Sequence, residues 1–406
     1  MKARWRRTRE RAVPSPSALS GWLERFNDPA APKAVAGTAF IPEVTEKLRS
    51  LWRVNLTLLG FIRTHQPLTA ATLDMDATLI ETHKRDALHC YKGFKAYRPL
   101  NCWWAEQGTM FYSEFRDGNV PAGHEQLRVM KDCLAYLPAS VKKVSLRPDT
   151  AGYQEELLRY YGEGKDPRFG FIDFAIGADV TQPFRAAAMA TAESEWKPLI
   201  RMVDGKPQVT DREWAEVCYV PNWAGYSRNR ADYRFLAIRE PLRRLALGDE
   251  AELPFPTQAF GHKGLYKLFG TVTNRKGTAI GSPSPSQGQA WWLRERCGKS
   301  EEVHSVIKSD LAGGQLPSGL FGANAAWWAL AILAHNLNAA MKQLVLGNDW
   351  AAKRMKALRF HLIALPGRVV SHARKLIIRL GGGVDALKMF ITARQTIRAL
   401  ACGPAG

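Results

Sequence analysis

Acidic residues are scarce in this chain relative to basic ones. Its 406 residues include 38 Asp and Glu against 57 Lys and Arg, which gives a formal net charge of +19 and a pI near 9.8. Such a deficit of negative charge points to a polyanionic partner, either nucleic acid or an acidic membrane surface. The apolar content of 46% and the charged content of 23% are those of an ordinary globular protein.

Cysteine pairs are also missing. The cysteines are widely scattered and form no Cys-x-x-Cys motif, which excludes a disulfide frame or a zinc-binding site of the usual spacing. They are Cys90, Cys102, Cys133, Cys218, Cys297 and Cys402. We expect reduced thiols in a cytoplasmic protein.

Long hydrophobic runs are absent as well. The basic residues 1–12 are followed by Pro14-Ser15-Pro16 where a secretory signal would have an apolar run. The longest apolar stretch, 323–341, is interrupted by three Asn and one His, so it predicts a buried helix and no membrane span. The sequence also has no internal repeat, no P-loop and no coiled-coil run. We therefore expect a soluble protein without a membrane partner.

The segment 296–308 carries an unusual polar helix face. Glu301, His304, Ser305 and Lys308 fall at positions i, i+3, i+4 and i+7, so a carboxylate, an imidazole, a hydroxyl and an ammonium share one side of a helix. A carboxylate followed by a lysine on one face is typical of a divalent metal beside a phosphate. A solvated helix face is the alternative interpretation.

Two further carboxylates share one face of a predicted strand. Strand alternation in 72–78 directs Thr72, Asp74, Asp76 and Thr78 to the same side. Buried carboxylates require a neutralising cation, so this pattern favours a cationic neighbour unless the strand is an exposed edge.

A strand at 144–147 leads to Asp149, a turn with Gly152 and the start of a helix at Tyr153. Ligands in open α/β sheets gather at the carboxyl ends of strands, which makes Asp149 a candidate ligand. Capping of the next helix is the alternative role for this Asp.

These three segments in order resemble the catalytic segments of the DDE transposases of bacterial insertion sequences, in the branch whose last motif reads Tyr-Arg-Glu-Lys. The Asp-x-Thr of the family matches Asp76-Ala77-Thr78, and its second Asp matches Asp149. Its Glu, followed by Glu-x-His and a Lys seven residues on, matches Glu301 to His304 and Lys308. The resemblance covers roughly residues 65–345.

The resemblance departs from the family at the Tyr and Arg of that motif. Those two places hold Arg294 and Cys297 here, and Arg296 lies one residue from the expected Arg. Arg296 is therefore our candidate substitute and, with His304 and Lys308, a candidate DNA-binding residue.

The resemblance implies a ribonuclease-H-like fold in which Asp76, Asp149 and Glu301 are both the catalytic residues and the metal ligands. They would hold two Mg²⁺ or Mn²⁺ ions. The implied activity is cut-and-paste DNA transposition through strand cleavage and strand transfer, with hairpin ends as a possible intermediate. The implied partners are double-stranded DNA, as element ends and target, and a second copy of the chain in a nucleoid-associated bacterial complex.

Element patterns predict an α/β protein with a ribonuclease-H-like mixed sheet, a β-rich insertion and flanking helical regions. Four parts are expected: a basic N-terminal helical region (1–66), a catalytic core (67–196 and 290–345), the insertion (197–289) and a basic C-terminal helical region (346–406). The order strand-strand-strand-helix-strand-helix-strand-helix gives the mixed core sheet. Trp214, Trp223 and Tyr226 in the insertion either stack on bases or form an aromatic core.

The C-terminal region is strongly one-sided in charge. Residues 353–398 hold eleven Lys and Arg and one acid, Asp385. We expect two amphipathic helices here, separated by Pro366-Gly367 and the glycines at 381–383. DNA contact and assembly are the two possible roles.

Two other functions remain open. A plain metal-dependent nuclease of the same fold would cut DNA without joining it. A catalytically inactive, DNA-binding remnant of a transposase would do neither.

Overall fold

The computed structural model describes residues 14–32, 37–203, 206–223, 233–242, 255–261, 264–275, 292–293, 299–373, 375–381 and 383–401. Within these residues the dominant element is a ten-stranded mixed sheet in the order β6-β5-β1-β7-β8-β13-β11-β10-β9, with β12 beside β13. The strands are β1 (Ala70–Ala77), β2 (Ile80–Glu81), β3 (Leu88–His89), β4 (Lys95–Tyr97), β5 (Leu100–Trp104), β6 (Thr109–Glu114), β7 (Lys143–Leu146), β8 (Asp173–Ala178), β9 (Lys197–Val203), β10 (Lys206–Val217), β11 (Arg234–Pro241), β12 (Thr257–Ala259), β13 (Leu265–Thr273), β14 (Gly367–His372) and β15 (Lys375–Leu380).

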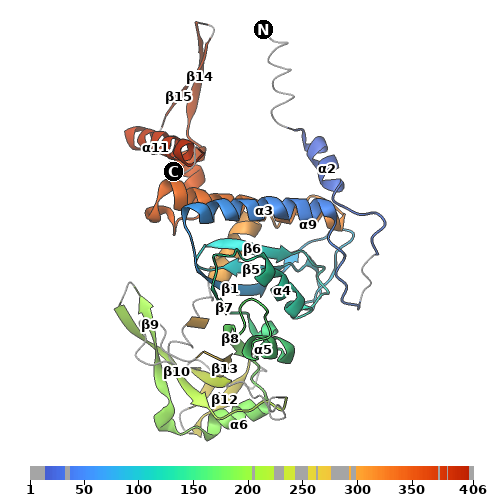
Figure 1. The fold of residues 1–406 in the computed structure, drawn as a ribbon, viewed down its shortest axis with the longest axis vertical. Helices are drawn as coiled ribbons and strands as arrows, with labels where there is room; N and C mark the ends of the chain where they lie inside the picture. Colours follow the sequence, from blue (N-terminus) through green and yellow to red (C-terminus); the bar gives the residue numbers. More distant parts are fainter. Residues whose placement is uncertain are drawn as a thin grey trace.

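Helices α3 and α9 lie at one end of this sheet and α6 near the other, whereas α2 and α11 lie away from it (Figure 1). The α-helices are α2 (Pro16–Glu24), α3 (Glu46–His65), α4 (Gln126–Tyr136), α5 (Glu155–Gly162), α6 (Gln182–Ala190), α8 (Lys299–Ser305), α9 (Phe321–Ala340), α10 (Met355–Leu358) and α11 (Gly383–Ala401). Short 3-10 turns are η1 (Thr150–Gly152), η2 (Glu193–Glu195) and η6 (Asn348–Trp350). Three π-helical turns, η4 (Val306–Asp310), η5 (Met341–Leu346) and η7 (Arg359–Ile363), continue α8, α9 and α10.

The first five long strands have the ribonuclease-H-like arrangement that the sequence predicts. Strands β1, β5 and β6 pair antiparallel, and β7 and β8 then add parallel to β1 on its other side. The crossovers run through α4 and through η1 with α5. Because the chain reaches β7 and β8 in parallel by helical crossovers, their carboxyl ends meet that of β1 at one edge of the core.

Helices α3 and α9 lie side by side and cover the β6 end of the sheet (Figure 1). Helix α9 is apolar on nearly all sides, as the predicted buried helix requires. Its interrupting polar residue Asn336 is satisfied, because its Oδ1 accepts from the Met110 N–H and its Nδ2 donates to Met110 O and Asn55 Oδ1. No helix of the described residues is long and apolar enough to cross a membrane.

The predicted β-rich insertion is present, and it extends the core sheet. Strand β13 pairs antiparallel with β8 from Gly270↔Ala178 to Thr273↔Ala175, so the insertion continues the same hydrogen-bonded ladder. Trp214 is buried with Leu199 and Ile238, which supports the aromatic-core interpretation at that position. Tyr226 lies outside the described residues.

The C-terminal region departs from our prediction of two helices. Strands β14 and β15 form an antiparallel hairpin between Pro366 and Gly381, and only the flanking segments are helical. Val369, Val370, Ile377 and Ile378 are all β-branched, and β-branched side chains favour a strand over a helix. Figure 1 shows this hairpin extending away from the sheet.

Candidate active site

Asp76 and Asp149 lie at the carboxyl ends of neighbouring parallel strands. Strands β1 and β7 are in register through Leu73↔Leu146, and the Asp149 N–H donates to the carbonyl of Met75 at 3.3 Å. The residue after that carbonyl is Asp76, so the two aspartates are neighbours across the strand ends. Both side chains are half-buried.

Asp149 also caps the turn that follows it. Its Oδ1 accepts from the Ala151 N–H at 3.1 Å, at the start of η1. The capping role considered for this residue is therefore present. It is compatible with ligation, because a carboxylate has two oxygens and about four lone-pair positions.

The other carboxylate of β1, Asp74, has a different environment. Arg147 binds it in a bidentate manner, Nε to Oδ1 at 2.7 Å and Nη2 to Oδ2 at 2.9 Å. Both side chains are buried, with 1% of Asp74 and 5% of Arg147 exposed. This is the cationic neighbour that the strand pattern requires. It gives Asp74 a structural partner, whereas the Asp76 side chain is 21% exposed.

A polar chain connects the core to His304, on α8. Trp328 Nε1 donates to Ser113 Oγ at 3.0 Å, Ser113 donates to Asn101 Oδ1 at 2.7 Å, and Asn101 Nδ2 contacts His304 Nε2 at 3.1 Å. An amide oxygen only accepts and an amide nitrogen only donates, so the two amide atoms of Asn101 fix the direction of the last two bonds.

It follows that Asn101 Nδ2 donates and His304 Nε2 accepts. The ring proton of His304 is then on Nδ1, which lies 3.9 Å from Asp76 Oδ2. The imidazole is thus oriented with its N–H toward the Asp76 carboxylate.

Lys308 reaches the same strand end from η4. Its Nζ donates to Thr78 Oγ1 at 3.0 Å and to the Leu79 carbonyl at 3.4 Å. Burial lowers the pKa of Lys308, and the nearby charge of Asp76 opposes that shift. The Lys308 ammonium therefore belongs to the electrostatic environment of Asp76.

Glu301 lies on the same helix, one turn before His304, and is exposed. Among the residues that the structure describes, no group of three or more His, Cys, Asp and Glu could hold a metal ion as placed. The structure thus brings Asp76, Asp149, His304 and Lys308 together but does not gather the three predicted ligands into one cluster. Arg296 lies outside the described residues.

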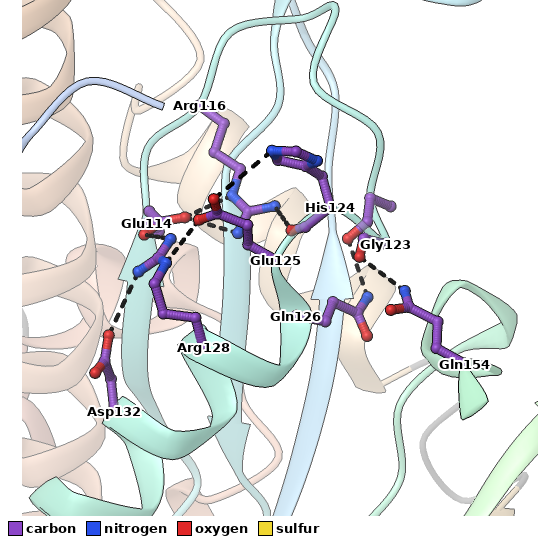
Figure 2. Close-up of polar contacts among 10 residues, drawn as sticks. Glu114, Arg116, Gly123, His124, Glu125, Gln126, Arg128, Asp132 and Gln154 are labelled. Atoms are coloured by element: carbon purple, nitrogen blue, oxygen red, sulfur yellow. Dashed lines mark hydrogen bonds and ion pairs between the residues drawn. The ribbon is translucent and has the colours of Figure 1, made fainter. Parts of the chain in front are cut away.

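A second polar network supports the turn after Asp149 (Figure 2). Gln154 Nε2 donates to the carbonyls of Gly123 at 2.7 Å and Ala151 at 2.8 Å. It thereby ties η1 to the loop before α4. A Cβ on Gly123 would lie 2.5 Å from that Gln154 nitrogen, so the contact requires glycine at this position.

The loop before α4 is itself held by ion pairs around the buried Glu114 and Arg116 (Figure 2). Arg116, 1% exposed, pairs with Glu114 at 2.7 Å and donates to the His124 carbonyl at 2.7 Å. Arg128 pairs with the other oxygen of Glu114 at 2.6 Å and with Glu125 at 2.7 Å. The turn that follows Asp149 is therefore hydrogen-bonded to a loop that ion pairs hold in place.

Our sequence reasoning missed Asn101, Arg147 and Gln154. Arg147 could have been predicted from the sequence. A carboxylate in an apolar strand requires a neutralising cation, and Arg147 directly follows β7, the strand parallel to β1. Asn101 and Gln154 act through contacts with residues far away in the chain or with backbone carbonyls, which no local pattern encodes.

Comparison with known proteins places the chain in a family. A family model described as the transposase DDE domain, group 1, matches residues 6–230, more than half of the chain. Among solved structures, a piggyBac transposase synaptic complex with hairpin DNA is similar, with a TM-score of 0.36 and 11% identity. That match covers 80% of this chain and 65% of the piggyBac chain, so this chain spans less than two thirds of that protein. No curated protein matches the sequence. From the family model, the chain belongs to the DDE-domain transposases of group 1.

Proposed function

We propose that this chain is the transposase of a bacterial insertion sequence of the Tyr-Arg-Glu-Lys branch, which cuts and joins DNA strands in cut-and-paste transposition. The observation that supports this most is the pair Asp76 and Asp149 at adjacent strand ends, with His304 and Lys308 beside Asp76. The arrangement offers carboxylates for a metal and an ammonium for a phosphate within one edge of the sheet.

Asp76, Asp149 and Glu301 are the residues that would hold two Mg²⁺ or Mn²⁺ ions. The donor set fits such ions, because all three groups are hard carboxylate oxygens and both aspartates are accessible at the strand ends. His304 Nδ1 lies 3.9 Å from Asp76 Oδ2, Lys308 Nζ donates to Thr78 two residues further on, and Glu301 lies one turn before His304 on the same helix. When bound, two divalent ions polarise the phosphodiester and activate the attacking water or 3′-hydroxyl.

The other side chains have supporting roles in this proposal. Lys308 would hold a phosphate oxygen next to the scissile bond. His304, with its N–H directed at Asp76, orients that carboxylate. Arg296, one residue from the position of the family's Arg, would contact the DNA backbone.

The proposed partners are double-stranded DNA, as element ends and as target, and a second copy of the chain in the DNA complex. A formal charge of +19 supports a DNA partner, since Lys and Arg release counterions on binding phosphates. The proposed location is the bacterial cytoplasm, on the nucleoid.

A strand-transfer assay tests this function. A linear DNA that carries the element's ends with free 3′-hydroxyls is incubated with Mg²⁺ and a supercoiled plasmid. We expect joined products that are lost in Asp76→Asn and retained in Glu156→Gln, which changes an exposed carboxylate on α5. A plain nuclease would give cut plasmid with no joined DNA, and an inactive remnant would bind the DNA and leave it intact.

A further inference from the structure

The two strands of the β14–β15 hairpin are exposed at nearly every residue. Its register pairs Arg368 with Arg379, Val370 with Ile377 and His372 with Lys375. Every residue of the two strands is exposed except the half-buried Val370. An isolated hairpin is at best marginally stable in water, so this element is expected to acquire a partner.

The two faces of the hairpin differ sharply in chemistry. Cross-strand partners lie on the same face, and successive residues alternate between faces. One face therefore carries the pairs Arg368/Arg379 and His372/Lys375 around an apolar centre. The opposite face carries Val369, Ile378, Leu376 and Leu380, with Ser371 as its one polar side chain.

The basic face of the hairpin carries positive charges that repel one another and that no acidic side chain balances among the described residues. Arg368 and Arg379 stand directly opposite each other, and like charges in that position destabilise a hairpin. The sequence between Pro366 and Gly381 contains no acid. No ion pair engages Arg368, Arg379, His372 or Lys375 among the residues that the structure describes. A polyanion laid along this face would remove the repulsion.

We propose that the basic face of the β14–β15 hairpin binds the phosphate backbone of duplex DNA, as an arm separate from the catalytic residues. A two-stranded ribbon has the width that the major groove admits. The inference rests on the proposed function in one respect, that the polyanion is DNA.

The base of the arm is tied to the catalytic helix. Asp310, at the end of η4, has a buried side chain that pairs with Arg354 at 3.2 Å and Lys356 at 3.7 Å, just before and within α10. Trp350, Leu358 and Leu362 form an apolar cluster with residues of η5 and α11. DNA held by the arm is thereby held by the same body that carries Lys308.

The test compares the two faces of the one hairpin in the full-length protein. Binding to a short duplex is measured without Mg²⁺ over a range of salt concentrations. We expect Arg368→Gln/Arg379→Gln to weaken binding and to reduce the slope of log affinity against log salt by about 1.8, roughly 0.9 for each lost phosphate contact. The matched control Val369→Thr/Ile378→Thr changes the adjacent register pair on the opposite face and should leave the slope unchanged.

A deletion of the whole hairpin controls for the case in which the arginine variant weakens DNA binding only because it misfolds. The Gly381 N–H donates to the Pro366 carbonyl at 2.7 Å, so the two ends of the hairpin meet and residues 367–380 can be removed as a unit. We expect the shortened protein to keep the thermal unfolding midpoint of the whole chain. The slope of log affinity against log salt should decrease by up to about 3.6, because the deleted segment contains four Lys and Arg.

Two results would overturn the proposal. One is an unchanged salt slope in the arginine pair variant. The other is a change from dimer to monomer in the apolar-face control, measured by sedimentation equilibrium, while neither variant changes the salt slope. That result would show that the hairpin serves self-association. Because the slope is measured without cleavage, a wild-type protein that never cuts DNA would contradict the proposed function and leave this test intact.

Discussion

At the scale of single residues, Asp74 and Asp76 show how two like side chains on one strand face acquire different roles. Asp74 is fully buried against Arg147, and its charge is balanced within the protein. Asp76 remains partly exposed beside His304 and Lys308. Burial and the identity of the nearest cation therefore separate a structural carboxylate from a candidate ligand.

Substituting these two aspartates should produce opposite defects. Asp74→Asn leaves the buried Arg147 guanidinium without its counter-charge and should lower the free energy of unfolding by roughly 3–5 kcal/mol. Asp76→Asn should cost much less stability and abolish DNA nicking. Urea unfolding and a nicking assay on both variants check this. Full activity of Asp76→Asn, or an unaltered stability of Asp74→Asn, would refute the division of roles.

His335 predicts a dependence of stability on pH. Burial lowers its pKa to about 4, with repulsion from Lys342 as a smaller cause. Neither ring nitrogen has a hydrogen-bond partner among the described residues. The pKa of His335 in the folded protein lies below its value near 6.5 in the unfolded chain. The neutral imidazole therefore imposes no penalty above pH 6.5, and the free energy of unfolding decreases as the pH falls from 6.5 toward 4.

In the wild-type protein this decrease in the free energy of unfolding amounts to up to about 3 kcal/mol, and we expect it to be absent from His335→Leu. The measurement is the free energy of unfolding at several pH values between 7 and 4. His89→Leu, an exposed position on β3, serves as the control. A pH dependence that is identical in the wild-type and His335→Leu proteins would show that His335 is not the source.

At the scale of elements, much of the core could be predicted from the sequence. The strand with Asp76, the strand–turn–helix at Asp149 and the helices at 299–305 and 321–340 all have strong local patterns, and each is present. The pairing of β13 with β8 could not be predicted, because it joins residues almost a hundred positions apart that carry no shared signal. The same holds for the contact of Asn101 with His304.

The β14–β15 hairpin was missed for a local reason. The sequence between His372 and Lys375 contains no Gly or Asn, the residues that normally mark a two-residue hairpin. Ala373 nevertheless adopts a φ of 47°, in the left-handed region. The β-branched residues Val369, Val370, Ile377 and Ile378 were the available signal, and the surrounding basic residues made the segment resemble an amphipathic helix.

Gln154 offers a prediction for the turn η1. It donates to the carbonyls of Ala151 and Gly123 and so holds the backbone next to Asp149. Gln154→Ala removes these bonds and should reduce nicking while raising the Mg²⁺ concentration needed for half-maximal activity. Gln154→Glu should be worse, because a carboxylate cannot donate to two carbonyls and repels both.

The Mg²⁺ requirement separates a positioning role from a merely structural one. A general loss of stability would lower the nicking rate at every Mg²⁺ concentration by the same factor. An unchanged half-maximal Mg²⁺ concentration in both Gln154 variants would therefore rule out positioning of Asp149.

At the scale of the whole molecule, charge and topology act together. The chain has a formal charge of +19, and the candidate ligands Asp76 and Asp149 lie at one edge of the core sheet, which the insertion extends on its other side. A surplus of positive charge attracts DNA regardless of sequence, and the acidic edge is where a divalent metal would be retained. Binding and cutting should therefore be separable by mutation.

The most direct test is Mg²⁺-dependent nicking of supercoiled plasmid by wild-type protein and by Asp149→Asn, with DNA affinity measured on the same samples. Glu156→Gln is the control for loss of a carboxylate elsewhere. Our account predicts that Asp149→Asn binds DNA with nearly wild-type affinity and produces no nicked circle, whereas Glu156→Gln nicks normally. Undiminished Mg²⁺-dependent nicking by Asp149→Asn would contradict the assignment of the active site.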